Sequence, residues 1–193
     1  MAEFEFRWEG PFPLRSVVSE PAADAPGLYL WGVMSENGYV LYYLGETGKT
    51  IAERIRAHIR CYRTGEFGLI DWDAFYRGEW KYLKPSYYRK YTPEARKTFR
   101  EEKVRWEPVI EGEVGRISVF VLPIPSWSGV AYRTMRMRLE QAIGEEITMN
   151  WPAGFPNHGK GIDEWKRKNQ KEWHYARFAG SESISGLPEQ IRF

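Results

Sequence analysis

The fold of this 193-residue chain is decided by two β-prone runs, GLYLWGVM at residues 27–34 and YVLYYL at residues 39–44. Both are rich in aromatic and branched apolar side chains, which favour strands. Asn37 and Gly38 stand between them, and both residue types tolerate the positive φ angles of a tight turn. We therefore predict an antiparallel β-hairpin.

A helix is predicted directly after the hairpin. Residues 45–49 have the composition of a loop, and the hydroxyl of Thr50 is suited to cap the first turn. Apolar residues then recur at helical spacing. They are Ile51, Ile55, Ile59 and Tyr62. We expect an amphipathic helix over residues 50–61.

A long interruption follows the first helix, and after it one more strand and one more helix are predicted. Residues 62–115 hold twelve aromatic residues between glycines and prolines. We interpret them as an insertion with short helices, one of them beginning near Thr92 with Pro93 in its first turn. The run RISVFVLP at residues 116–123 predicts a third strand. A second amphipathic helix is expected over about residues 130–147.

These elements predict an α/β (α+β) fold in one domain. Its core, residues 26–61 and 116–150, would be a small three-stranded sheet built on the hairpin and flanked by helices. Residues 62–115 would be a large insertion, and residues 151–193 a C-terminal extension with a loosely ordered tail from Gly180.

Five side chains suited to phosphate chemistry are distributed over these elements. Tyr29 and Tyr43 lie on neighbouring predicted strands, and Arg54 and His58 are four residues apart on one face of the first helix. Glu140 lies beside an apolar position of the second helix. The ordered set, with Gly-Leu-Tyr at 27–29 and Tyr-Leu-Gly at 43–45, resembles the GIY-YIG nuclease superfamily. Leucine replaces isoleucine at the centre of both tripeptides.

The resemblance implies a metal-dependent endonuclease that hydrolyses phosphodiester bonds in DNA, with RNA not excluded. It implies one divalent cation, Mg²⁺ or Mn²⁺, held by Glu140 and water. Arg54 would clamp the phosphate through its planar guanidinium. Either Tyr29 or Tyr43 would act as the base or orient the attacking water, with His58 supporting the phenol, and the sequence leaves the choice between the two tyrosines open.

Further residues are candidates for nucleic-acid contacts. Lys49 precedes the first helix, where a phosphate would meet the helix N-terminus. Arg89 and Lys90 belong to a basic stretch, residues 77–105, with ten Lys or Arg against four Glu. Asn150 and Asn157 both qualify for an asparagine that often follows the glutamate helix in the family.

Other interpretations of the same residues stay open. Arg136 precedes Glu140 by four residues and is a possible surface ion-pair partner, and Glu145 and Glu146 are rival carboxylates. A non-catalytic nucleic-acid- or protein-binding module on the same scaffold is the alternative function. A P-loop at residues 45–50 is disfavoured, because that motif needs glycine where Tyr43 stands.

Composition and charge limit the classes of protein to which this chain can belong. The formal net charge is +2, and Cys61 is the single cysteine, so an internal disulfide is excluded. No apolar run approaches the roughly 20 residues that span a bilayer, and the first residues lack the apolar segment of a signal peptide. We expect a cytoplasmic protein without membrane partners.

Overall fold

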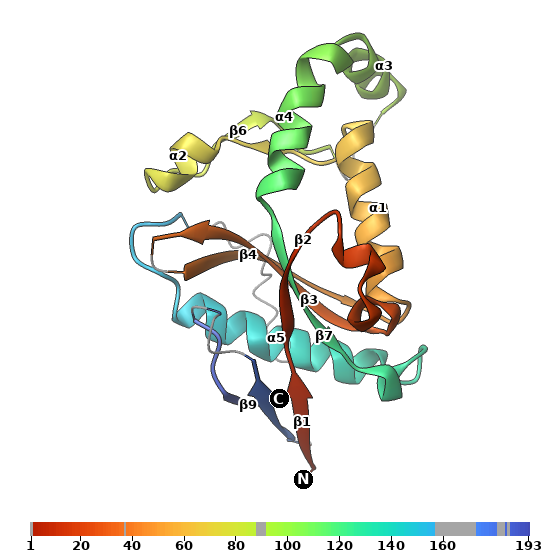
Figure 1. The fold of residues 1–193 in the computed structure, drawn as a ribbon, viewed down its shortest axis with the longest axis vertical. Helices are drawn as coiled ribbons and strands as arrows, with labels where there is room; N and C mark the ends of the chain where they lie inside the picture. The colour runs from red at the N-terminus through yellow and green to blue at the C-terminus, as the bar shows by residue number, and fades with distance from the viewer. Residues whose placement is uncertain (1, 37, 88–91, 157–172, 181–183, 185) are drawn as a thin grey trace.

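A four-stranded antiparallel sheet lies at the centre of the molecule (Figure 1). In the computed structural model, residues 2–36, 38–87, 92–156, 173–180, 184 and 186–193 are described. The strands across this sheet are, in order, β2 (Glu9–Pro13), β7 (Ser118–Pro123), β3 (Gly27–Ser35) and β4 (Gly38–Thr47). The expected mixture of helices and strands is confirmed.

The predicted hairpin is formed by β3 and β4, which pair antiparallel along their length. Tyr29 stands opposite Gly45, and Trp31 stands opposite Tyr43. The register then shifts by one residue, as in a β-bulge, so that Tyr42 and Tyr43 both pack on the same side of the sheet. An antiparallel pair before the 45–50 loop also argues against a P-loop, which follows a strand of a parallel sheet.

The two faces of the hairpin support two different helices. Alternate residues of a strand point to opposite faces, and here they belong to separate apolar clusters. Tyr29, Trp31 and Val33 pack with α1 (Ile51–Thr64), whereas Leu28, Leu30 and Leu44 pack with α5 (Arg133–Met149). Helices therefore flank the sheet, as predicted.

The first helix begins as expected and ends later. The hydroxyl of Thr50 accepts a hydrogen bond from the Glu53 amide at 3.1 Å, which caps the helix. It ends one turn beyond the predicted limit, at Gly65, whose φ of 80° is the left-handed conformation that glycine adopts without strain.

The prediction of a three-stranded sheet is wrong by one strand. β2 pairs with β7 and carries Pro11 and Pro13, which weakened its strand signal in the sequence. Because β2 lies at the sheet edge, its prolines can sit where no ladder hydrogen bond is needed.

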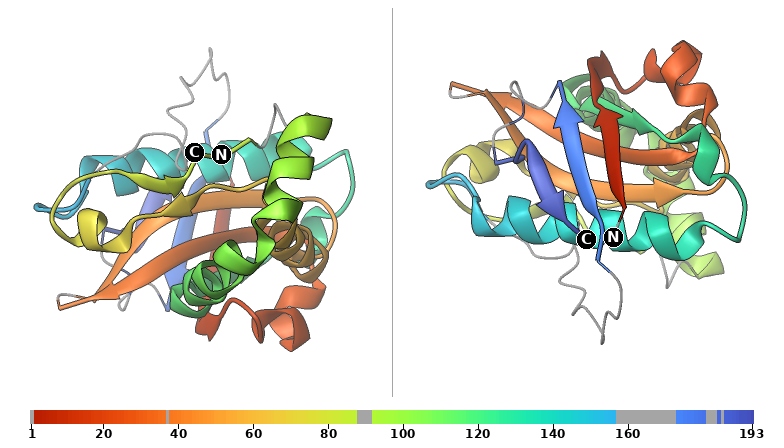
Figure 2. Two further views of the ribbon diagram at one scale, coloured as in Figure 1. Left: turned by 90° about the horizontal axis from the view of Figure 1, so that it is seen from above. Right: turned by 90° about the horizontal axis from the view of Figure 1, so that it is seen from below.

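A second sheet was also not predicted. It consists of β1 (Glu3–Arg7), β8 (Tyr175–Ala179) and β9 (Gln190–Arg192), and Figure 2 shows it on the same side of the central sheet as α5. Phe193 is fully buried in the cluster between them. The expectation of a loosely ordered tail is thus wrong for this last segment. β9 pairs with β8, and β8 pairs with β1 from the opposite end of the chain, a long-range contact that no local pattern indicates.

The insertion forms a layer above the hairpin (Figure 1). It contains, in order, β5 (Leu69–Ile70), α2 (Trp72–Tyr76), β6 (Tyr82–Lys84), α3 (Pro93–Glu101) and α4 (Lys103–Arg116). α3 begins after Thr92 with Pro93 at its first position, as predicted, and the Thr92 hydroxyl caps it. Trp72 and Phe75 are buried against the cluster around α1, so these aromatic residues pack the core. Within the described part of the chain, none of the helices has the length and apolarity needed to span a bilayer.

One carboxyl group is buried under this layer. Glu113 on α4 is 2% exposed, and Trp72 Nε1 donates a hydrogen bond to its Oε2 at 2.5 Å. Burial raises the pKa of Glu113 to about 8. The side chain is therefore a neutral acid at pH 7.

We predict that Glu113→Gln removes a pH-dependent loss of stability. A folded-state pKa above the unfolded one gives stability that is complete below about pH 4 and is lost as the pH rises toward 8. Glutamine keeps the neutral form at every pH. Between pH 5 and pH 9, the free energy of unfolding of the wild type should fall by on the order of 3–5 kcal/mol relative to that of the variant, as measured by urea unfolding. The exposed Glu107→Gln on the same helix is the control, and a wild-type-to-variant difference that does not change with pH would contradict the prediction.

Candidate active site

Three of the predicted residues meet where α1 crosses the hairpin. The side chain of Tyr29 is fully buried, with its hydroxyl 2.8 Å from His58 Nε2. Arg54 Nε donates a second hydrogen bond to the same hydroxyl at 3.4 Å. Because Arg54 and His58 are one helical turn apart, one face of α1 presents both groups to one phenol.

Tyr43 completes the cluster from the neighbouring strand. Its ring stacks on that of Tyr29, with 6.0 Å between centroids, and lies 5.5 Å from the ring of His58. The β-bulge places it there, since it turns Tyr43 toward α1. Unlike Tyr29, Tyr43 is only half-buried. The structure thus brings Tyr29, Tyr43, Arg54 and His58 together.

Both glycines of the paired tripeptides are required by close approach. A Cβ at Gly45 would overlap the ring and hydroxyl of Tyr29 on the opposite strand. A Cβ at Gly27 would overlap the carbonyl oxygen of Leu122 on β7. Glycine in a strand interior often marks such a contact. Gly45 therefore creates the space in which the Tyr29 phenol lies.

The cluster contains a neutral imidazole and a protonated phenol. Burial, followed by the nearby Arg54 guanidinium, lowers the pKa of His58 to about 3. Burial, followed by the neighbouring Tyr43, raises the pKa of Tyr29 well above its usual value near 10, although Arg54 opposes this. The Tyr29 hydroxyl thus accepts a hydrogen bond from Arg54 and shares a second one with Nε2 of the neutral His58.

Two further aromatic residues enclose His58, and the sequence did not identify them as part of the site. The rings of Trp31 and Phe67 lie 5.0 Å and 5.3 Å from the imidazole. Trp31 stands two residues after Tyr29, so strand periodicity placed it on the same face. Phe67 follows the end of α1, and no local pattern indicates its contact. These rings exclude water, which is why the imidazole stays neutral.

Glu140 lies on α5, which packs on the opposite face of the sheet from α1, and its side chain is half-buried. One turn earlier, the buried Arg136 forms an ion pair with Glu46 on β4, with Nε and Oε2 3.0 Å apart. Arg136 also donates to the carbonyl oxygens of Trp127 and Gly129. Arg136 therefore binds the carboxylate of Glu46.

The ion pair fixes where α5 lies along β4. α5 runs antiparallel to β4 beside it (Figure 1), and Arg136 is anchored at the end of the strand. Glu140 lies about 6 Å further along the helix axis, toward the part of β4 that carries Tyr43. α5 and the Tyr43 cluster therefore lie on opposite faces of the four-stranded sheet, of which β4 is an edge strand.

The other predicted residues are placed as follows. Lys49 is exposed immediately before α1. Asn150 is exposed at the end of α5, where its side-chain amide donates to the Glu146 carbonyl oxygen at 2.9 Å. Arg89, Lys90 and Asn157 lie outside the described residues. Among the residues that are described, no three His, Cys, Asp or Glu side chains are grouped so that they could hold a metal ion.

Comparisons with known proteins find no family model, no curated protein and no solved structure that matches this chain. Its chemistry is therefore assigned from the cluster itself. Two phenols, a neutral imidazole and a guanidinium supply hydrogen-bond donors, a proton acceptor and a fixed positive charge. Such groups stabilise an anion that gains charge during a reaction, as a phosphoryl group does.

We predict that Gly45→Ala displaces the Tyr29 phenol and destabilises the fold. The new methyl group overlaps the ring and hydroxyl of Tyr29, and overpacking of this kind costs about 1–3 kcal/mol. Gly112→Ala is the matched control, because its Cβ meets no atom within 4 Å on an exposed turn of α4. That change should be neutral or stabilise by up to about 1 kcal/mol. Equal unfolding free energies for the two variants would show that Gly45 is not constrained by Tyr29.

Proposed function

We propose that this chain is a metal-dependent endonuclease of the GIY-YIG type, which hydrolyses phosphodiester bonds in DNA. The observation that carries the proposal is the buried hydroxyl of Tyr29, hydrogen-bonded to both His58 and Arg54. Residues 29, 54 and 58 come from a strand and a helix in the order the superfamily requires. A polar network of this kind is costly inside a core, so its presence favours a role in function.

Arg54 is assigned to bind the scissile phosphate. Its side chain is half-buried, and the hydrogen bond from its Nε to Tyr29 restricts the plane of the guanidinium. A guanidinium held in place loses less rotamer entropy when it binds a phosphate through its planar fork. This positive charge would offset the charge that develops on the phosphoryl oxygens.

The two tyrosines are assigned different roles. Tyr29 is fully buried and keeps its proton, so it acts as a positioning residue between His58 and Arg54. Tyr43 is half-buried beside it and remains accessible from solvent. We therefore assign Tyr43 as the phenol that contacts the substrate and orients the attacking water. His58, neutral and enclosed, holds the Tyr29 hydroxyl through their hydrogen bond.

Glu140 is assigned as the protein ligand of one divalent cation, Mg²⁺ or Mn²⁺. A single carboxylate suits Mg²⁺, because this ion keeps several waters and takes its other ligands from substrate phosphates. The ion would supply positive charge at the scissile phosphate. Arg136 and Glu46 act as positioning residues, since their ion pair holds α5 against β4.

The test is cleavage of plasmid, oligonucleotide and RNA substrates with Mg²⁺ or Mn²⁺. Arg54→Ala and Glu140→Ala should each lower the cleavage rate by at least about 100-fold while circular dichroism shows that both variants stay folded at the assay temperature. Tyr43→Phe should lower the rate more than Tyr29→Phe. Glu145→Ala, on the same helix and also half-buried, is the matched control and should keep activity.

Two outcomes would contradict the assignment. Unchanged cleavage by Glu140→Ala would attribute the activity to another carboxylate or to a contaminant. Binding of nucleic acid or of a protein without cleavage of any substrate would favour the non-catalytic module.

A further inference from the structure

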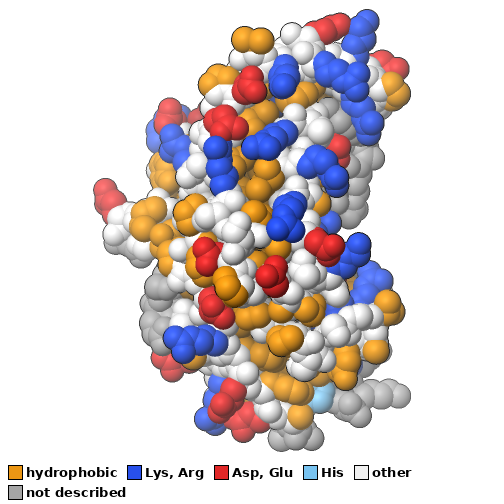
Figure 3. Space-filling view, turned by 45° about the vertical axis from the view of Figure 1, so that its right-hand side comes forward, with side chains coloured by type: hydrophobic (Ala, Val, Ile, Leu, Met, Phe, Trp, Pro, Cys, Tyr) orange, Lys and Arg blue, Asp and Glu red, His pale blue; other side chains and the backbone are white. Residues whose placement is uncertain are grey.

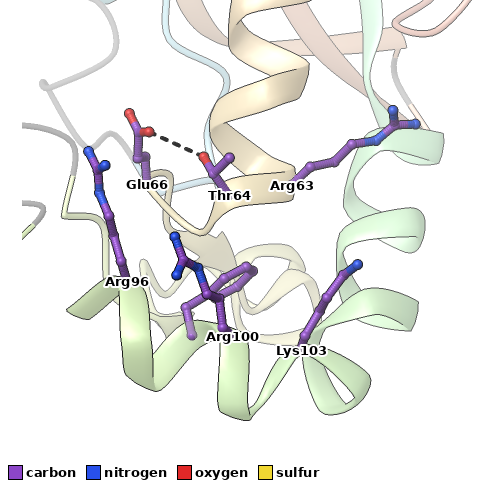
Figure 4. A pocket seen from close by; sticks show the side chains of 7 residues that line it. Arg63, Thr64, Glu66, Arg96, Arg100 and Lys103 are labelled. Atoms are coloured by element: carbon purple, nitrogen blue, oxygen red, sulfur yellow. Dashed lines mark hydrogen bonds between the residues drawn. The ribbon is translucent and has the colours of Figure 1, made fainter. Parts of the chain in front are cut away.

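A basic pocket lies apart from the cluster, between the end of α1, α3 and the start of α4 (Figure 4). Its lining shares no residue with the candidate active site. The residues that line it are Arg63, Thr64, Glu66, Arg96, Phe99, Arg100 and Lys103. Three separate elements, the end of α1, α3 and the start of α4, thus contribute cationic side chains to its lining.

The lining carries four cationic side chains and one carboxylate, a formal charge of +3. The carboxylate, Glu66, accepts hydrogen bonds from Thr64 at 3.2 Å and from the Cys61 thiol at 3.6 Å. Arg96 and Arg100 are four residues apart on one helix, a spacing at which like charges repel. An anion bound in the pocket would offset this repulsion.

The pocket is built on a rigid frame. The ring of Phe99 on α3 is buried against Gly65, where a Cβ would overlap it. The ammonium of the buried Lys84 lies 5.4 Å from the same ring and donates to the Gly65 carbonyl oxygen at 2.5 Å. α3 is therefore locked onto the end of α1, and the charged side chains start from fixed positions. Preorganisation of this kind lowers the entropy cost of binding.

The positive charge extends beyond the pocket. Figure 3 shows Lys and Arg side chains gathered over the upper part of one face, around α1 and α3. Arg60 and Lys97 are exposed on these helices beside the lining residues, and Lys97 Nζ lies 3.9 Å from the Glu101 carboxylate. A small anion needs one enclosed site, whereas an extended polyanion matches an open row of cations.

We propose that this pocket binds a backbone phosphate of the nucleic acid at a distance from the scissile bond, a proposal that rests on the proposed function. Arg54 and Arg63 are nine residues apart on α1, which is roughly 13 Å along its axis. That length corresponds to about four base steps of a strand. The two side chains stand about two and a half turns apart, on opposite sides of α1, so a nucleic acid that contacts both sites must pass around this helix. Such contacts fix position on the substrate without reading its sequence.

The test is binding of a fluorescein-labelled DNA duplex by the full chain, measured by anisotropy in EDTA over a series of NaCl concentrations. The double variant Arg63→Ala/Arg100→Ala should weaken binding at least about 10-fold. It should also make the negative slope of log K against log [NaCl] shallower by about 1–2, because each lost phosphate contact releases about one counterion fewer. Arg7→Ala/Arg192→Ala is the control, with the same charge change at exposed positions of the second sheet. It should leave the slope nearly unchanged. Melting temperatures check that all proteins are folded.

Parallel cleavage assays in Mg²⁺ separate this proposal from the nuclease proposal. For a cleaving enzyme, the pocket variant should raise KM and leave kcat unchanged. If it binds and cleaves as the control does, the pocket proposal is wrong and the nuclease stands. If the wild type cleaves nothing but its salt-dependent binding still requires the pocket, the nuclease proposal fails and the pocket stands. Binding of inorganic phosphate or pyrophosphate without binding of any nucleic acid would overturn the pocket proposal.

Discussion

The close approach of the Tyr29 phenol to Gly45 is the constraint from which the rest of the site follows. The phenol can lie over β4 only because position 45 has no side chain. In that place its hydroxyl is buried and needs hydrogen-bond partners, since a buried polar group without them is costly. His58 and Arg54 on α1 provide both partners, and so the hairpin and the first helix are held in one orientation.

The sheet divides the candidate machinery between its two faces. The phenols, imidazole and guanidinium lie on the α1 side, while the only candidate metal ligand lies on α5, on the other side. The ion pair of Arg136 with Glu46, on the edge strand β4, fixes the helix that carries Glu140. The precision of the site therefore depends on a contact that takes no part in the chemistry.

The insertion is the packed scaffold that carries most of the basic pocket's side chains. Trp72 and Phe99 are packed in its interior, and Arg96, Arg100 and Lys103 are exposed on α3 and α4. α1 connects this scaffold to the cluster, because its first turns carry Arg54 and His58 and its last turn carries Arg63. One helix thus relates the proposed cleavage site to the proposed phosphate pocket.

Local physics made much of the fold predictable from the sequence. The alternating hairpin, the Thr50 and Thr92 caps and the spacing of Arg54 and His58 are all set by neighbours within a few residues. Only the tertiary structure decided that β2 extends the sheet, that β1 pairs with β8, and that the bulge brings Tyr43 to the Tyr29 face. It also decided which tyrosine is buried and which basic residues line one pocket. These depend on contacts between distant segments, whose free energy comes from packing in the folded chain and leaves no periodic pattern in the sequence.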